Sequence, residues 1–325
     1  MSNSITPSVI IPVLNNPKGL ERCVKAIRRG GLAFELIIVD NGSSDETLEI
    51  ANRYADKVLV CPGLTIGAMR NQGAKAASSS ILVFTDSDQE PAEDWLAVGL
   101  LAIQSDQEVG LAGARYHALP ESRWVARSWD LQRSSSNHAG DIGWLQGGNL
   151  FARREAFERV GGFRSDLIAS EDVDLSIRMR LAGYRVVCDP RIVNFHHGDP
   201  QTLWEFFNKE RWRGSSGWRA WATQGCPLDG LTSLLWPVWV VAGLPVLGGI
   251  CLSLNAYWMN LPSWVILLAS FLVWLFPAVS RAVRICPNEV RSVTEVARLA
   301  VLYLVYGLAR LASVALPSKG SKQPW

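Results

Sequence analysis

The sequence predicts an α/β protein with a mostly parallel sheet, followed by a membrane domain of apolar helices. Two observations lead to this prediction. Through roughly the first 200 residues, short apolar segments alternate with stretches of helical periodicity, as in a parallel sheet covered by helices on both faces. Beyond them, no charged residue occurs between Asp229 and Arg281, although 19% of the chain is charged.

The first part of the chain alternates strand and helix in a regular order. Each apolar run is closed by Gly, Pro, Asn or Asp, the residues that end strands and helices. The expected elements are a strand at Ser8–Leu14, a helix through Leu20, Val24 and Ile27, a strand at Leu36–Val39, a helix capped by Ser44, a strand at Lys57–Cys61, a helix at Gly67–Ser79 and a strand at Ile81–Thr85.

A second block runs from Trp144 to His197. Its glycines and acidic residues mark the ends of further helices and strands. The expected elements are an apolar segment at Leu150-Phe151, a helix at Arg154–Val160, a helix that begins at Glu171 with Ile177 and Leu181 on its inner face, a strand at Tyr184–Cys188 and a short segment at Ile192–Phe195.

Two aspartates, Asp86 and Asp88, follow the strand at Ile81–Thr85 directly. The carboxyl ends of parallel strands share one edge of a sheet, so Asp40 is expected at the same edge. Mg²⁺ or Mn²⁺ binds one or two protein carboxylates and fills its other positions with phosphate oxygens and water. The pair therefore predicts a metal ion that carries the phosphates of a donor substrate.

Composition narrows the class of protein. A formal net charge of +2 is too small to create an overall positive potential that would attract nucleic acid. Six cysteines show no metal-binding spacing, which indicates reduced, structural thiols. The only apolar run near the N-terminus, at residues 9–14, is too short for a signal peptide, so we expect the first domain to lie in the cytoplasm.

The last third of the sequence has the composition of a membrane domain. Apolar runs at about 231–254, which has no charged residue, and at about 263–283, which has Arg281 near its end, are each long enough to span the hydrocarbon core. Arginines after the second run place that loop on the cytoplasmic side, which gives a multi-pass protein of the cytoplasmic (inner) membrane. A third apolar segment at about 296–316 contains Arg310 and is either a third span or an interfacial helix.

The ordered motifs resemble the family 2 inverting glycosyltransferases of the GT-A fold. The resemblance covers roughly residues 7–215 and is carried by Val9–Leu14, Ile37–Asp45, Arg70–Gly73, Thr85–Asp88, Gly147–Asn149, Glu171–Asp174 and Gly183–Val186. Asn208, Arg211 and Trp212 further resemble the Q-x-x-R-W motif of membrane-embedded, bacterial-type members, with Asn in place of Gln.

The resemblance implies a role for each matched residue. Asp172 would be the general base, with Glu171 as the alternative. The remaining assignments are Pro12, Asp40, Asn41, Arg70 and Asp86 to nucleotide-sugar binding; Asp86, Asp88 and one histidine of the pair His196-His197, with His197 preferred, to the metal; and Gly148, Asn149, Arg211 and Trp212 to the acceptor and diphosphate.

The resemblance also implies an organisation and a function. Residues 1–200 would form the catalytic domain, residues 201–229 an amphipathic interfacial segment and residues 230–325 the membrane domain. The expected reaction is metal-dependent transfer, with inversion, of a sugar from a nucleotide-diphosphate sugar (a UDP-sugar first of all) to a lipid-linked or membrane-delivered acceptor. The small number of helices favours a single transfer over polymer export. The alternatives are a polyprenyl-phosphate glycosyltransferase and a non-catalytic nucleotide-sugar-binding membrane protein.

Overall fold

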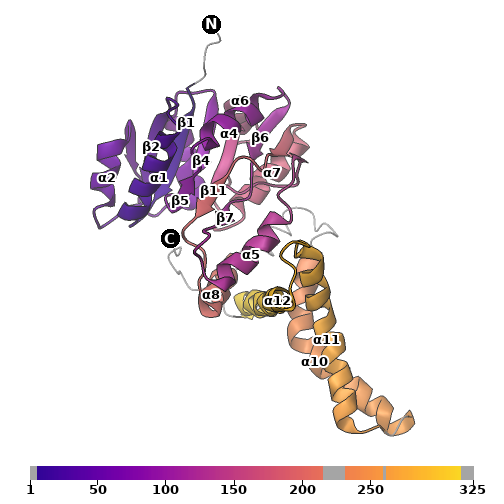
Figure 1. Cartoon of the computed structure of the whole chain (residues 1–325). Coiled ribbons are helices and arrows are strands. Elements are labelled where there is room, and N and C mark those ends of the chain that lie inside the picture. Colours follow the sequence, from indigo (N-terminus) through magenta and orange to yellow (C-terminus); the bar gives the residue numbers. More distant parts are fainter. Residues whose placement is uncertain (1–5, 215–230, 259–260, 316–325) are drawn as a thin grey trace. The chain divides into compact units, whose positions relative to one another are not determined.

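The computed structural model describes residues 6–214, 231–258 and 261–315 (Figure 1). The chain divides into two units. The first comprises the chain up to Pro120 together with Ser136–Asp199, and the second comprises Glu121–Ser135 and the chain from Pro200 onward. The segment 121–135 thus groups with the C-terminal helices, although the sequence predicted it to lie inside the first domain.

An eight-stranded sheet forms the centre of the first unit, in the order β3-β2-β1-β4-β9-β6-β10-β8. Its buried strand bodies are nearly all apolar, which explains why they form the core. The strands are β1 (Ser8–Val13), β2 (Glu35–Asp40), β3 (Lys57–Val60), β4 (Ile81–Thr85), β6 (Val109–Gly113), β8 (Gly140–Asp141), β9 (Asn149–Arg153) and β10 (Arg185–Cys188).

The sheet is mixed but mostly parallel. Strands β1 to β4 are parallel to one another, and β6 is parallel to β10. Strand β9 lies between β4 and β6 and is antiparallel to both. The start of β9 therefore reaches the edge at which β2, β4 and β6 end, and this edge gathers residues from four strands.

A second sheet of three short strands lies in the order β5-β11-β7. These strands are β5 (Gln89–Pro91), β11 (Asn194–His196) and β7 (His117–Ala118). Strand β5 follows Asp88 directly, and His196 pairs with Gln89 on one side and Ala118 on the other. This small sheet therefore holds the chain after β4 against the chain after β6.

Helices cover the large sheet. Helix α3 packs on β1 and β2. Gly73 allows this close packing, because a Cβ at this position would collide with Ile10. The helices of this unit are α1 (Pro17–Arg29), α2 (Thr47–Tyr54), α3 (Ile66–Ala76), α4 (Trp95–Gln104), α6 (Arg154–Arg159) and α7 (Glu171–Leu181).

Two local predictions were wrong. Helix α2 begins at Thr47 and has Glu46 at its N-cap, and the Ser44 backbone N–H donates to Asn15 instead. Leu181 is 82% exposed, because it is the last residue of α7 and lies beyond the sheet. The buried face of α7 is formed by Leu175 and Met179.

The regular secondary structure of the second unit, within the residues described, is helical. The helices are α5 (Trp124–Ser134), α8 (Leu203–Gly214), α10 (Leu231–Trp258), α11 (Ser263–Ile285) and α12 (Val293–Ala315). The last three are long and apolar enough to cross a membrane. The Trp129 ring on α5 contacts the rings of Phe206, Tyr303 and Tyr306, so α5, α8 and α12 share one aromatic core.

Candidate active site

A buried arginine joins the two halves of the site. The guanidinium of Arg70 donates to Glu171 at 2.7 Å and to Asp86 at 2.8 Å, and Arg70 is only 3% exposed. It also lies over the Phe163 ring at 5.4 Å. Arg70 was predicted beside the nucleotide. The structure gives its charge an internal role, since it neutralises carboxylates that end β4 and begin α7.

The glycine pair at the start of β9 makes room for these groups. A Cβ at Gly147 would lie 2.6 Å from Nη1 of Arg70, and one at Gly148 would collide with the Asp86 carboxylate. Any larger residue would therefore displace Arg70 or Asp86. The two glycines therefore allow the backbone to approach the side chains of Arg70 and Asp86 closely.

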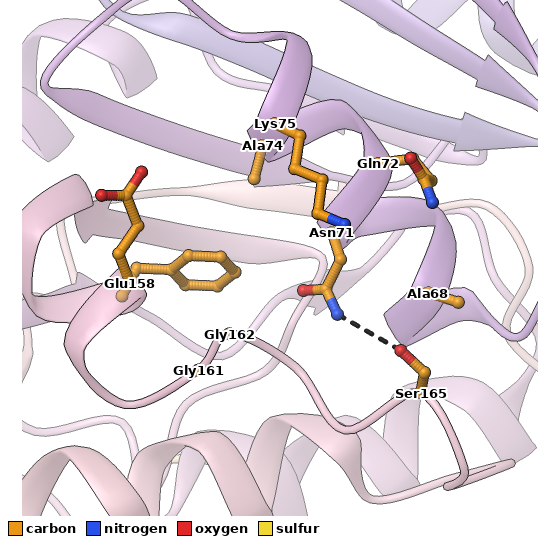
Figure 2. A pocket seen from close by; sticks show the side chains of 10 residues that line it. Ala68, Asn71, Gln72, Ala74, Lys75, Glu158, Gly161, Gly162 and Ser165 are labelled. Atoms are coloured by element: carbon orange, nitrogen blue, oxygen red, sulfur yellow. Dashed lines mark hydrogen bonds between the residues drawn. The ribbon is translucent and has the colours of Figure 1, made fainter.

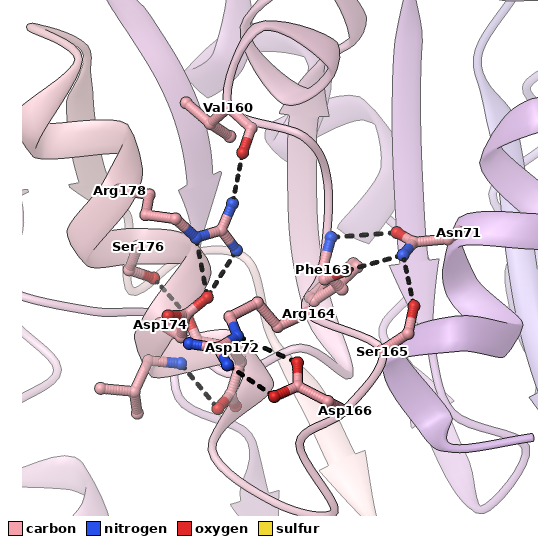
Figure 3. Close-up of polar contacts among 11 residues, drawn as sticks. Asn71, Val160, Phe163, Arg164, Ser165, Asp166, Asp172, Asp174, Ser176 and Arg178 are labelled. Atoms are coloured by element: carbon pink, nitrogen blue, oxygen red, sulfur yellow. Dashed lines mark hydrogen bonds and ion pairs between the residues drawn. The ribbon is translucent and has the colours of Figure 1, made fainter. Parts of the chain in front are cut away.

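Asp172 and Glu171 occupy the first turn of α7 but differ in environment. Glu171 is 7% exposed and bound to Arg70, whereas Asp172 is partly exposed and accepts the Gly147 N–H at 3.1 Å. Figure 3 shows this turn braced by the neighbouring pair Asp174–Arg178 and by the Ser176 hydroxyl, which donates to the Asp172 carbonyl. Of the two carboxylates, Asp172 is the more accessible.

Burial and the charge of Asp172 raise the pKa of Glu171 to about 7, although Arg70 acts in the opposite direction. One guanidinium is shared between Glu171 and Asp86, so it compensates neither completely. Glu171 therefore takes up a proton near neutral pH, and it is a poor general base because its carboxylate is occupied by Arg70.

Asp40 ends β2 and is 1% exposed. Its Oδ1 accepts the N–H groups of Gly42 and Ser43, while Oδ2 is buried and has no partner among the described residues. An unpaired buried carboxylate oxygen is costly, so it points to a donor group on a ligand. Asn41 uses its amide to hold the Leu64 backbone, which positions the chain before α3.

The residue beside Asp88 is His196, not His197. Nε2 of His196 lies 3.2 Å from Asp88, and its Nδ1 lies 3.1 Å from Asp199. His197 contacts Glu90 at 2.9 Å instead. His196 is the last residue of β11 and His197 lies in the turn that follows, so the geometry favours His196 over the predicted His197 as the histidine of the metal site.

The acidic pair suits a divalent ion of the magnesium type. Asp86 and Asp88 have side chains that are 30% and 29% exposed, and Arg70 takes only one oxygen of Asp86. Within the described residues, no three His, Cys, Asp or Glu side chains form a metal cage of their own. Mg²⁺ and Mn²⁺ need only one or two carboxylates when phosphates and water supply the remaining ligands.

Two predicted contact residues belong to the interior. Pro12 is buried in β1, opposite Val39. Asn149 is fully buried: its Oδ1 accepts from Trp95, and its Nδ2 donates to the carbonyls of Ala114 and Ile192. Asn149 therefore holds the start of β9 in place through these hydrogen bonds, and its side chain exposes no surface to a ligand.

Arg211 and Trp212 lie on α8 in the second unit. The predicted interfacial segment 201–229 is described only as far as residue 214, and its later part lies outside the described residues. On the same helix, Glu210 is 2% exposed and binds Arg213 at 2.7 Å and Arg310 of α12 at 2.8 Å. This ion triad fixes the helix that carries the two residues.

A separate hollow of about 340 Å³ lies between α3 and the chain around Gly162 (Figure 2). Asn71 crosses it to hold the Phe163 backbone in both directions. This contact fixes the loop that leads to Glu171, as Figure 3 also shows. Adjacent residues of α3 thus serve the site from two directions, Arg70 directly and Asn71 through the loop.

Sequence reasoning missed Arg115, Tyr116 and Trp144, which also lie at this edge. Arg115 and Tyr116 closely follow β6, whose sequence Val-Gly-Leu-Ala-Gly is too short and glycine-rich to predict a strand. Arg115 could nonetheless have been found from the same pattern that marked Asp40 and Asp86, namely a polar residue at the end of a buried strand. The Tyr116 ring stacks on His196 with centroids 4.5 Å apart.

Residues 8–161 match the family model described as Glycosyl transferase family 2. This segment is a family 2 glycosyltransferase domain. The mixed sheet and its acidic edge are those of the GT-A fold. The fold is similar to that of a mannosyltransferase from Pyrobaculum calidifontis, solved with GDP-Man and Mn²⁺, with a TM-score of 0.59 at 18% identity. The match covers 98% of this chain and 89% of that one.

Two curated relatives are glycosyltransferases or biosynthesis proteins by name. Glycosyltransferase AglE of Haloferax volcanii is 29% identical over 250 residues, which is 73% of this chain and 80% of that protein. Succinoglycan biosynthesis protein ExoA of Rhizobium meliloti is 26% identical over 232 residues, which is 66% of this chain and 70% of that protein. These likenesses support a transferase.

The shifted pKa of Glu171 predicts a pH-dependent stability. Its folded value of about 7 exceeds the ordinary 4.5, so folding takes up a proton in that window and the free energy of unfolding falls as pH rises through it. Glu171→Gln should remove this loss, on the order of 1–3 kcal/mol. Thermal unfolding from pH 4.5 to 8 should show the variant gaining on the wild type. Glu158→Gln, at an exposed position, is the control. A constant difference across pH would contradict the assignment.

Proposed function

We propose that the protein is a membrane-bound, inverting, metal-dependent glycosyltransferase that uses a nucleotide-diphosphate sugar and a lipid-linked or membrane-delivered acceptor. The observation that carries the proposal is the gathering of Asp40, Asp86, Asp88 and Asp172 at one sheet edge, around the buried Arg70. Such an edge offers acceptors for a base, ligands for a metal and a carboxylate for a proton.

The donor would lie along the ends of β2 and β4. The unpartnered Oδ2 of Asp40 would accept a hydrogen bond from an N–H of the nucleotide base. The next residue, Asn41, holds this segment in place through its hydrogen bond to the Leu64 carbonyl. A UDP-sugar remains the first choice, and the GDP-Man of the Pyrobaculum mannosyltransferase makes a GDP-sugar the second. Binding of UDP and GDP to the purified protein would separate these two donors.

Asp86 and Asp88 would hold Mg²⁺ or Mn²⁺, the latter being the ion solved with that mannosyltransferase. When bound, such an ion neutralises charge on the departing diphosphate. The protein's own contribution is to orient both carboxylates. Arg70 does so for Asp86, and His196 lies against Asp88.

Asp172 would take the proton of the acceptor hydroxyl. It is more accessible than Glu171, and the Gly147 N–H and the first turn of α7 orient it. Attack from the side of this base, opposite the diphosphate, inverts the anomeric carbon. Trp212 and Arg211 on α8 would contribute acceptor contacts, with the aromatic ring serving a sugar or lipid head group.

Two other functions differ in what they require. A polyprenyl-phosphate glycosyltransferase would use the same donor edge with a phosphate as acceptor. A non-catalytic nucleotide-sugar-binding protein would have no use for the accessible Asp172 beside an intact Asp88. The names of AglE and ExoA fit roles in glycolipid or polysaccharide synthesis.

Helices α10 and α11 would cross the cytoplasmic membrane as a hairpin, with the catalytic domain in the cytoplasm. Helix α12 would instead lie in the interface. Helix α5 has only 11 residues, and the first unit precedes and follows it, so it stays on the catalytic side.

Helix α12 is tied to catalytic-side helices along most of its length. Glu295 accepts from Ser128 and Tyr303 donates to Gln132, both on α5, while Arg310 binds Glu210 of α8. These contacts extend over about 22 Å of helix at 1.5 Å per residue. The exposed residues Val293, Val301 and Leu308 would face lipid.

Loss of one metal ligand should abolish transfer without unfolding the protein. Asp88→Asn removes charge from a partly exposed side chain at a strand end, so we expect at least a hundredfold lower transfer and loss of the Mn²⁺ requirement for nucleotide binding. Titration of UDP and GDP with Mn²⁺ or EDTA measures this. Asp45→Asn, at a helix start, should behave as the wild type. Normal turnover of Asp88→Asn in EDTA would refute the metal dependence.

Loss of the base should affect chemistry more than binding. Asp172→Asn should lower transfer by ~10²–10⁴ and leave nucleotide affinity within a few-fold. Asp174→Asn is matched, since Asp174 shares this turn but pairs with Arg178. Trp212→Ala should raise the acceptor KM more than it lowers kcat. Transfer to membrane lipids in nanodiscs, followed by mass analysis, provides the readout. Equal losses in Asp172→Asn and Asp174→Asn would exclude Asp172 as base.

The interfacial position of α12 predicts the sidedness of its ends. In a variant without native cysteines, Ser292→Cys and Ser318→Cys should both label from the cytoplasmic side only. Ser263→Cys, at the start of α11, should label from the opposite side. Labelling of residues 292 and 318 from opposite sides would make α12 a third span.

A further inference from the structure

Arg115 is a buried cation with hydrogen-bond donors that have no partner among the described residues. It is 5% exposed, and its Nε and Nη1 have no partner among the described residues. Its guanidinium lies over the Trp144 ring at 3.5 Å, so the planar group is held flat on an aromatic surface. A buried charge left in this state costs several kcal/mol, which a protein keeps where a ligand uses it.

The surroundings keep this group charged. Burial lowers the pKa of Arg115, while the negative charge of Asp172 acts to raise it. An arginine remains protonated in proteins even under such a shift. Asp172 therefore acts on Arg115 through its charge, but it accepts no hydrogen bond from Nε or Nη1 of that guanidinium.

The chain around Arg115 connects the metal side of the site to the base side. Its neighbour Tyr116 stacks on His196, which contacts Asp88. The Tyr116 N–H donates to Gln146, and the next residue, Gly147, donates to Asp172. Arg115 thus belongs to the segment that spans the distance between Asp88 and Asp172.

We propose that Arg115, held flat against Trp144, binds a phosphate oxygen between Asp88 and Asp172. Two free N–H groups in a fixed fork match the oxygens of a phosphoryl group better than a neutral sugar hydroxyl. The phosphate belongs either to the donor diphosphate or to a phosphorylated lipid acceptor. This inference rests on the proposed function, because both ligands enter through that site.

Binding to the detergent- or nanodisc-embedded full chain tests the inference without requiring turnover. The variants are Arg115→Met, which keeps length and removes charge, Arg115→Lys, which keeps charge and loses the fork, and Arg191→Met as a control at an exposed arginine. The probes are UDP and GDP with Mn²⁺, the matching monophosphates, and a polyprenyl phosphate beside its unphosphorylated polyprenol.

If the donor supplies the phosphate, Arg115→Met should weaken diphosphate binding at least tenfold and change monophosphate binding little. If the acceptor supplies it, diphosphate binding should stay constant and the preference for polyprenyl phosphate over polyprenol should fall tenfold. Arg115→Lys should be intermediate in either case. The Tm of Arg115→Met should equal or exceed that of the wild type, since a buried unpaired charge is removed.

Unchanged binding of every probe in Arg115→Met, or a lower Tm with unchanged binding, would overturn the inference and make Arg115 a packing residue. Nucleotide binding by the wild type separates this result from failure of the proposed function. A wild type that binds neither nucleotide nor polyprenyl phosphate would refute both proposals, whereas a wild type that binds, with variants that bind equally, would refute only this one.

Discussion

The guanidinium of Arg70 donates to Asp86 at the end of β4 and to Glu171 at the start of α7, and nearly all of it is buried. Removing one partner from such a buried charge pair costs about 3–5 kcal/mol. The glycines at 147 and 148 make space for Arg70 and Asp86, and the Gly147 N–H in turn holds Asp172. Orientation of the acidic pair, of the glycine turn and of the first turn of α7 therefore depends on one cation.

The acidic edge needs cations because it concentrates negative charge. Within the protein, Arg70 compensates Asp86 and Glu171, yet burial still raises the pKa of Glu171 to about 7. Asp40 retains an unpaired buried oxygen, and Arg115 retains two unpaired donors. The unpaired acceptor lies at the end of β2 and the unpaired donors lie after β6. A ligand with both N–H donors and phosphate oxygens would form hydrogen bonds with both.

The second unit also contains a buried group of charges that neutralise one another, here among apolar residues. Arg310 lies in the apolar stretch of α12 that follows Arg298, where a lone charge is expensive. Glu210 of α8 accepts from it and from Arg213, and the flanking arginines hold the pKa of Glu210 below its usual value against the effect of burial. Trp129 of α5 packs against Phe206 of α8 and Tyr303 of α12. Helix α5 therefore belongs to the second, helical unit, although in the sequence it lies between two strands of the first unit.

Local sequence patterns were enough to predict the strands β1, β2 and β4, the aspartates at the ends of β2 and β4, and the long apolar helices, because these depend on local periodicity and length. Tertiary structure decided the rest. Pairing made β9 antiparallel and brought Gly147 and Gly148 to the acidic edge. The end of β11 at His196 brought that histidine, and not His197, beside Asp88, and burial turned Asn149 inward. Long-range packing moved α5 into the second unit and left the donors of Arg115 unpaired, because contacts between distant segments leave no periodic trace in the residues that make them.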